Sequence, residues 1–190
     1  MHTNRKLLSV LLIFTISFSG CLGAQSAYQI SNVENKRTIN NCTSINKPGH
    51  YELKSNITNG GGTGISKSCI KIRSGNVVLD GNGHTISGRG NSHTTGVQVI
   101  TSKATGGVKI QNLSLTDWHN GVEFRQATTA IVQNVMASSN VFGISVENVT
   151  RAQIKWNTIQ NNTVGIRVND GIEQLEVDKN SYSNNEVEIL

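Results

Sequence analysis

A tetrapeptide pattern recurs at nearly constant spacing from residue 69 onward, and it constrains the fold more than any other feature. Its five copies are Cys69–Ile72, Gly96–Val99, Gly121–Phe124, Gly143–Val146 and Gly165–Val168, and their starts are separated by 27, 25, 22 and 22 residues. In each copy the second and fourth residues are apolar and the third is polar. Because successive side chains of a β-strand point to opposite sides, this alternation predicts a short strand with one buried face.

Three further columns of residues keep the same register. They are Ile110, Val132, Ile154 and Val177; Leu115, Ala137, Ile159 and Tyr182; and Trp118, Asn140, Asn162 and Asn185. A unit of about 22 residues has room for three short strands with their turns, but not for a strand and a helix with normal loops. The columns therefore predict an all-β, single-stranded parallel β-helix, a β-solenoid of stacked coils, over residues 69–190.

The turns between the predicted strands are rich in asparagine and glycine. Stacked coils would place Asn140, Asn162 and Asn185 above one another, so we expect a structural ladder in which each side-chain amide bonds to the next coil. The glycine that opens four of the five tetrapeptides indicates either a positive φ or a close approach of two backbones.

The start of the chain differs from the rest in composition. Arg5 and Lys6 precede an apolar run over residues 7–18, which is too short to span a membrane and is typical of a secretory signal. The protein is therefore expected outside the cytoplasm, at the cell surface or secreted.

The residues that follow the apolar run predict how the signal ends. Residues 18–21, Phe-Ser-Gly-Cys, resemble a lipoprotein box, which implies a signal peptide over 1–20 and a lipid anchor on Cys21. The membrane would then be contacted only through this lipid. Cleavage near Ala24 is the alternative. Residues 21–38 are interpreted as a linker.

The two ends of the predicted solenoid need separate treatment. In an oxidising compartment Cys42 and Cys69 would form a disulfide that closes a loop of 27 residues, with two free thiols as the alternative. Residues 39–68 show no clean repeat and are interpreted as an irregular first coil and cap. At the C-terminal coil an exposed strand edge is expected, where edge-to-edge self-association with a second copy is one outcome.

Residues 77–86, Val-Val-Leu-Asp-Gly-Asn-Gly-His-Thr-Ile, and the asparagine-rich coils behind them resemble exported right-handed parallel β-helix proteins with a pectate-lyase-like solenoid. The segment from Cys42 to Cys69 is similar to the start of those proteins, and the resemblance covers about residues 39–190. It implies right-handed winding and a surface protein of archaeal type, with repeats shared by carbohydrate-binding and sugar-hydrolase domains. One branch of the group serves periplasmic copper-site assembly for nitrous oxide reductase, so the fold does not select one activity.

The charge pattern argues against one class of partner. Removal of residues 1–20 takes Arg5 and Lys6 from the 17 basic residues, which leaves 15 basic against 12 acidic residues without any Lys/Arg run. A nucleic-acid surface normally gathers its basic residues on one face, so no nucleic-acid partner is expected. No cofactor is expected either.

Catalysis on a polysaccharide would need clustered carboxylates, either to bind calcium or to flank a glycosidic bond. Carboxylate pairs can arise here only between adjacent coils, and the nearest set by register is Asp80 with Asp117 or Glu123. No paired-Asp motif and no Arg-flanked lysine motif accompanies them. The sequence therefore favours no catalytic residue, and a polysaccharide lyase or hydrolase that uses these three residues stays an alternative.

Two insertions interrupt the repeat and are the places where a binding site is expected. Alignment of Ile86 with Leu113 predicts four extra residues near 81–84, and a second insertion spans 88–95, with Arg89 as a candidate ligand contact.

Histidine and tryptophan supply the remaining candidates. His84, His93 and His119 would form a metal site if the insertions bring them together. Trp118 is a candidate for stacking on a sugar ring, with a structural role as the cap of the Asn ladder as the alternative.

The favoured hypothesis is a non-enzymatic surface protein that binds a glycan or another envelope component, or serves a structural role. A carbohydrate-active enzyme and a copper-handling periplasmic protein are the two alternatives.

Overall fold

The computed structural model describes residues 36–58, 60, 67–90, 92–101, 106–169 and 171–190. The expected signal peptide, Cys21 and most of the linker lie outside these residues. The part of the chain from Glu34 onward forms one compact unit. All its named elements within the described residues are β-strands. No helix long and apolar enough to cross a membrane occurs among the described residues.

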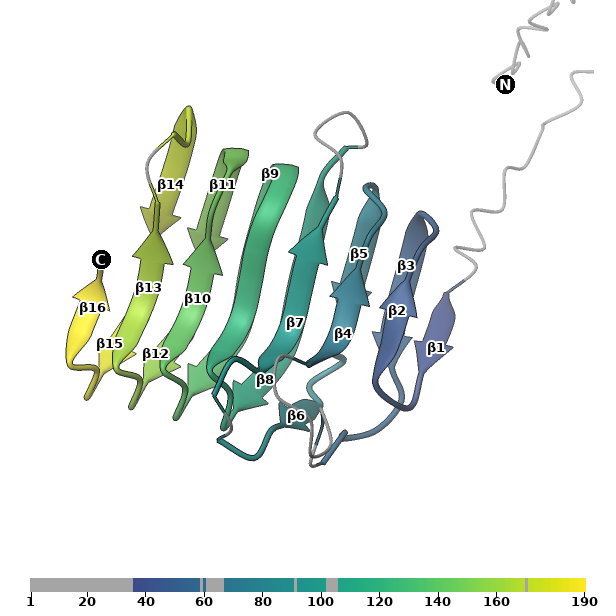
Figure 1. Cartoon of the computed structure of the whole chain (residues 1–190), viewed down its shortest axis with the longest axis horizontal. Helices are drawn as coiled ribbons and strands as arrows, with labels where there is room; N and C mark the ends of the chain where they lie inside the picture. The colour runs from purple at the N-terminus through teal and green to yellow at the C-terminus, as the bar shows by residue number, and fades with distance from the viewer. Residues whose placement is uncertain (1–35, 59, 61–66, 91, 102–105, 170) are drawn as a thin grey trace, which may run out of the picture. The chain divides into compact units, whose positions relative to one another are not determined.

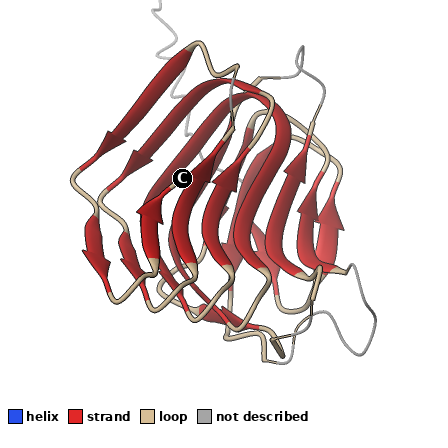
Figure 2. Ribbon diagram, turned by 60° about the vertical axis from the view of Figure 1, so that its left-hand side comes forward, coloured by secondary structure: helices blue, strands red, loops and turns tan. Residues whose placement is uncertain are grey.

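The strands wind into a solenoid with three faces, here called faces 1, 2 and 3 (Figures 1 and 2). Face 1 contains β2 (Thr43–Ile45), β4 (Ser68–Ile72), β7 (Thr95–Ile100), the start of β9 (Asn120–Ser138), β10 (Phe142–Val146), β13 (Val164–Val168) and β16 (Val187–Ile189). Face 2 contains β1 (Arg37–Ile39), β3 (Gly49–Leu53), β5 (Val77–Asp80), the start of β8 (Val108–Thr116), the middle of β9, β11 (Val149–Lys155) and β14 (Gln174–Asp178). Face 3 contains β6 (Thr85–Ser87), the ends of β8 and β9, β12 (Thr158–Gln160) and β15 (Ser181–Ser183).

Every named strand pair is parallel, and each strand pairs with its equivalents in the neighbouring coils. Face 1 pairs Ile70 with Val97, Val97 with Val122, Val122 with Ile144 and Ile144 with Ile166. These offsets of 27, 25, 22 and 22 residues confirm the register predicted from the tetrapeptides. The inward side chains of the three faces fill one continuous apolar core.

The glycine column is explained by close packing between coils. A Cβ atom added at Gly121 would lie 2.6 Å from the carbonyl oxygen of Gly143, and one added at Gly143 would lie 2.6 Å from that of Gly165. None of these three glycines has a positive φ. Of the two reasons considered for the column, close approach of two backbones is therefore the one that applies.

The Asn column forms the expected contacts. The Nδ2 atom of Asn140 donates to Oδ1 of Asn162 at 3.1 Å, and Nδ2 of Asn162 donates to Oδ1 of Asn185 at 3.0 Å. A second ladder, at the turn between faces 2 and 3, was not identified from the sequence. There Nδ2 of Asn157 donates to Oδ1 of Asn180 at 2.9 Å. Both ladders satisfy buried turn groups that no strand pairing reaches.

The first coil is more regular than expected. Parallel pairing already joins β1 to β3, with Arg37 opposite Tyr51, so the solenoid extends toward the N-terminus beyond the expected boundary at Cys69. Cys42 and Cys69 form a disulfide with a Cα–Cα distance of 4.4 Å. Each cysteine comes directly before a paired residue of face 1, because Thr43 lies opposite Ile70. The disulfide therefore joins two coils at the position that glycine occupies in later coils.

The first insertion is shorter than the sequence alignment suggested. Ile86 pairs with Leu115 and not with Leu113, so this coil has two extra residues and not four. The alignment was wrong because the turn around Gly81 packs directly against the backbone of Asn112, where a Cβ atom would lie 2.4 Å from its carbonyl oxygen.

The last described coil exposes apolar side chains that its equivalents bury. Leu175 is 48 % exposed and Ile189 is 50 % exposed, whereas their partners Ala152 and Ile166 are buried. Self-association at this edge stays a prediction.

Candidate functional site

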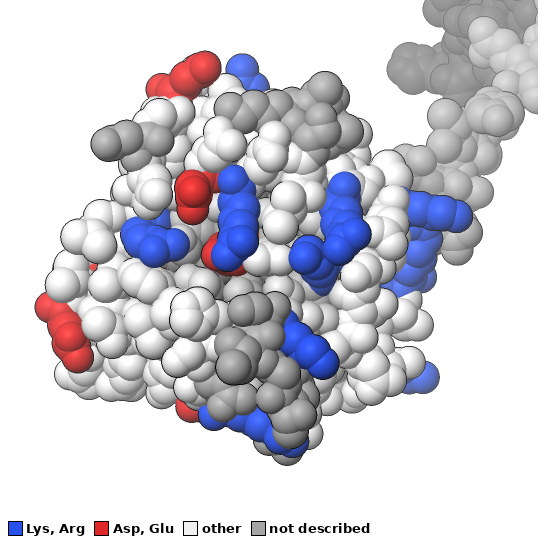
Figure 3. Space-filling model, in the orientation of Figure 1, with Lys and Arg blue, Asp and Glu red and all other residues white. Residues whose placement is uncertain are grey.

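Face 1 carries a column of polar and charged outward side chains. The strand register places Lys71, Gln98, Glu123, Ser145 and Arg167 in one line. Neighbouring strands are about 4.8 Å apart, so the line is about 19 Å long. Figure 3 shows lysine and arginine side chains spread across this face, with acidic side chains between them.

A hollow of about 390 Å³ lies over this line. Its lining includes three cations, Lys71, Arg125 and Arg167, against the single carboxylate of Glu123. The surplus of positive charge favours an anionic ligand.

Glu123 is the buried anchor of the hollow, because its residue surface is only 3 % exposed. Nε2 of Gln98 donates to its Oε2 atom at 2.7 Å, and Nε of Arg125 donates to its Oε1 atom at 3.0 Å. Nδ2 of Asn120 lies 3.5 Å from Oε1, which is a long hydrogen bond. The carboxylate is thus neutralised by Arg125 and is held in one orientation.

Arg125 owes its position to an irregularity in the strand register. Val99 lies opposite Phe124, but Ile100 lies opposite Gln126, so Arg125 is an extra residue between two pairs. Bulges of this kind redirect a side chain and are common next to binding sites. The Arg125 side chain is 56 % exposed, while its guanidinium still reaches Glu123. It therefore presents charge to a ligand and supports the buried carboxylate at the same time.

Asn120 holds an acceptor that the described protein atoms leave unsatisfied. The residue is 6 % exposed and lines the hollow, and its Oδ1 atom is buried without a hydrogen-bond partner. An orphaned buried acceptor costs about 1–3 kcal/mol. A ligand hydroxyl that donates to this oxygen would recover that free energy.

Two histidines and a phenylalanine form one wall of the hollow. The rings of His93 and His119 are stacked with centroids 5.5 Å apart, and the Phe142 ring meets His119 edge-on at 5.5 Å. The guanidinium of Arg167 lies 4.2 Å from the centre of the Phe142 ring. Burial lowers the pKa of His119 below 6.5, and the charges of His93 and Arg167 lower it further, against the opposite effect of Glu123. His119 is therefore mainly neutral at pH 7.

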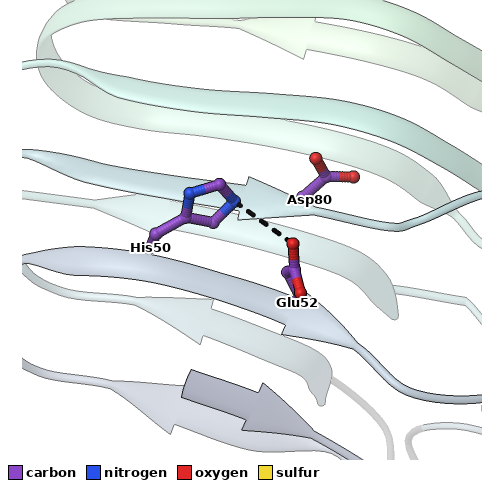
Figure 4. Close-up of side chains that lie close together, drawn as sticks. All are labelled: His50, Glu52 and Asp80. Atoms are coloured by element: carbon purple, nitrogen blue, oxygen red, sulfur yellow. Dashed lines mark ion pairs between the residues drawn. The ribbon is translucent and has the colours of Figure 1, made fainter. Parts of the chain in front are cut away.

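A second polar group lies on the outward side of face 2 (Figure 4). His50 and Glu52 are two residues apart on β3 and so point to the same side, and Glu52 lies opposite Asp80 of β5. One ligand atom from each residue lies within 4.8 Å of the other two. Among the described residues this is the one group of three or more His, Cys, Asp or Glu side chains that could hold a metal ion.

The Asp80 carboxylate is held by donors from the next coil and from its own turn. Nε2 of Gln111 donates to it at 2.7 Å, the backbone N–H of Asn82 at 2.8 Å and Nδ2 of Asn112 at 3.1 Å. Burial raises the pKa of Asp80, but these hydrogen bonds and the charge of His50 outweigh that effect, so its pKa lies below 3.8. Asp80 is therefore ionised and fixed in orientation.

The three candidate catalytic carboxylates are not brought together. Asp80 lies on the outward side of face 2 and Glu123 on the outward side of face 1. Asp117 is exposed at the corner before face 1, with a positive φ of 63°. Their grouping by register was wrong, because residues on adjacent coils meet only when they also share a face.

The candidate metal histidines are only partly brought together. His93 and His119 stack, whereas His84 lies on the turn between β5 and β6, and the three do not form a metal-binding group among the described residues. Arg89 is exposed after β6 and does not line the hollow on face 1.

The candidate sugar-stacking tryptophan is in the core. Trp118 is 2 % exposed, its Nε1 atom donates to the carbonyl oxygen of Ile86 at 3.1 Å, and its backbone N–H donates to Oδ1 of Asn140 at 3.0 Å. It caps the Asn ladder, which was the alternative. The exposed tryptophan is Trp156, which is 50 % exposed and was missed because it falls in no apolar column.

The winding of single strands into parallel stacked coils defines the protein as a β-solenoid. A family model described as right handed beta helix region matches residues 95–189, which is 95 of the 190 residues. The chain belongs to this right-handed β-helix family. No curated protein and no solved structure matches it.

Proposed function

We propose that the protein is a non-enzymatic β-helix protein that binds an anionic glycan, such as a uronic-acid polymer, in the hollow on face 1. The observation that carries this proposal is one hollow that combines three cations with the unsatisfied buried acceptor of Asn120. Carboxylates of the glycan would pair with Lys71 and Arg167, and a hydroxyl would donate to Asn120.

The shape of face 1 supports a polymer as the ligand. The outward line from Lys71 to Arg167 crosses five strands without a change of register. A rigid sheet surface presents its polar groups at fixed intervals, so a repeating ligand can use several of them at little cost in protein entropy.

Binding is favoured over cleavage by the state of the carboxylates. Glycoside hydrolysis needs two carboxyl groups on opposite sides of one bond, at about 5–9.5 Å from each other. In the hollow Glu123 is the lining carboxylate, and it is engaged by Gln98 and Arg125. A cleaving enzyme is thus the alternative that the experiment below tests.

We further propose that this binding takes place outside the cytoplasm. The basic start and apolar run of residues 1–18 support export, and so does the Cys42–Cys69 disulfide, which suits an oxidising compartment. Anchoring through a lipid on Cys21 belongs to the same proposal and would be checked by mass spectrometry of the mature N-terminus.

The test is calorimetric titration of the full chain with polygalacturonate, alginate and uncharged dextran at low salt. We expect both uronate polymers to bind and dextran not to bind. Arg167→Ala and Lys71→Ala should each weaken binding about tenfold, since a charge-assisted hydrogen bond contributes about 1.5–3 kcal/mol. Binding should also weaken as salt rises.

Arg151→Ala is the matched control, because Arg151 is an exposed arginine on face 2. It should leave the affinity unchanged. Equal binding of dextran, or an equal loss in Arg151→Ala, would contradict the proposal. Release of reducing ends from either polymer during the titration would instead support the enzyme.

A further inference from the structure

The outward side of face 2 holds a group whose chemistry the glycan site does not use. His50, Glu52 and Asp80 offer one imidazole nitrogen and two carboxylate oxygens within 4.8 Å of one another (Figure 4). Their backbone positions follow from the strand pairing alone. His50 and Glu52 are alternate residues of β3, and Asp80 lies opposite Glu52 in the next coil.

We propose that His50, Glu52 and Asp80 bind a divalent transition-metal ion of the Zn²⁺ type. Imidazole with carboxylates suits zinc and its neighbours, whereas calcium and magnesium prefer oxygen ligands alone. The Nε2 atom of His50 lies 3.9 Å from Oε1 of Glu52, and small side-chain rotations bring such a pair to the spacing that two bonds of about 2.0–2.2 Å require.

The surroundings of Asp80 match those of a metal ligand. Gln111 and Asn112, both on β8, donate to its two oxygens from the coil that follows. Outer groups of this kind fix the orientation of a ligating carboxylate before the ion arrives. The rigid strands β3, β5 and β8 hold all the participating residues, so little entropy is lost on binding.

Lys36 shows what the ion would displace. Its Nζ atom forms an ion pair with Oε1 of Glu52, the same oxygen that lies nearest to His50. The Lys36 side chain is 47 % exposed, so its ammonium group can move into water when a metal ion takes its place. The ammonium and the metal therefore compete for one carboxylate.

The test is calorimetric titration of the metal-stripped full chain with Zn²⁺, with the metal content checked after dialysis. We expect one ion per chain and Ca²⁺ binding at least tenfold weaker. His50→Ala and the isosteric Glu52→Gln should abolish binding in this range. Gln111→Ala should weaken it about tenfold, as loss of an outer group typically does.

Two further variants keep the result interpretable if His50→Ala folds poorly. Lys36→Met removes the competing ammonium, so it should tighten Zn²⁺ binding by about threefold or more. His84→Ala removes a histidine outside the group and should change nothing. Absence of stoichiometric Zn²⁺ binding, retention of it in Glu52→Gln, or an equal loss in His84→Ala would overturn the proposal.

Discussion

The coils before Trp118 and the coils after it keep the same stacked geometry by different means. In the later coils, glycine lets the backbones approach, and Asn140, Asn162 and Asn185 link one coil to the next. In the earlier coils a disulfide occupies the glycine position, and Trp118 occupies the Asn position. The repeat geometry is therefore fixed at the level of the backbone, and several kinds of side chain can support it.

The difference also separates stability from chemistry. The second half of the hollow's outward line, Ser145 and Arg167, belongs to the regular coils, but Lys71, Gln98, the bulged Arg125 and the stacked His93 belong to coils that depart from the 22-residue period. The metal group of His50, Glu52 and Asp80 lies entirely in the early coils. Irregular coils are thus where this fold places its reactive side chains.

The largest effect is expected from breaking the Asn ladder of the later coils. The Asn162 side chain accepts from the backbone N–H of Asn140 at 3.0 Å and donates to the carbonyl oxygen of Ala137 at 3.0 Å, both buried. Asn162→Ala would leave both groups unsatisfied and lower the free energy of unfolding by about 4 kcal/mol. Urea denaturation measures this change.

The control for the ladder is Asn169→Ala, because Asn169 is an exposed asparagine of the same coil. Its effect should stay within about 0.5 kcal/mol. Equal effects of the two variants would show that the ladder does not stabilise the later coils.

A slightly smaller effect is expected from opening the covalent link of the early coils. The Cys42–Cys69 disulfide spans 27 residues, for which the loop-entropy relation gives about 3.5 kcal/mol. The double variant Cys42→Ser, Cys69→Ser should lose this amount in thermal or urea unfolding. Reduction of the native protein should have a similar effect and should leave the double variant unchanged. A native protein that unfolds at the same urea concentration with and without reductant would contradict this.

The smallest effect, and one of opposite sign, is expected at Trp156. This exposed residue has a φ of 55°, while the stacked residues Asn112 and Asn134 have 52° and 51°. Asparagine tolerates this region better than a bulky residue does. Trp156→Asn should stabilise the protein by about 0.5–1 kcal/mol, since relief of backbone strain exceeds the lost contacts with Lys155 and Lys179.

Urea midpoints of the native protein and the Trp156→Asn variant decide this point. Thr163→Ala, another exposed position of the later coils, is the reference for a neutral change. A loss of stability in Trp156→Asn would mean that the indole stabilises its turn more than the strained backbone costs.

Several features of the candidate sites could not be read from the sequence. The columns predicted which residues share a strand position, but not that Asp80 and Glu123 point away from different faces. The group of His50, Glu52 and Asp80 was missed because β3 falls in residues that showed no clean repeat. The alternation at 49–53, where Tyr51 and Leu53 are buried, is the signal that would have placed His50 and Glu52 on one side.

The sequence by itself determined the parallel stacking, its register and the ladder residues. These follow from side-chain alternation and from a repeat that is the same in every coil, so local pattern and long-range pairing agree. Only the tertiary structure decided where Trp118 lies, which carboxylates meet and how Arg125 reaches Glu123. Those outcomes depend on corners, insertions and one bulge, where a shift of one or two residues changes the face to which a side chain points.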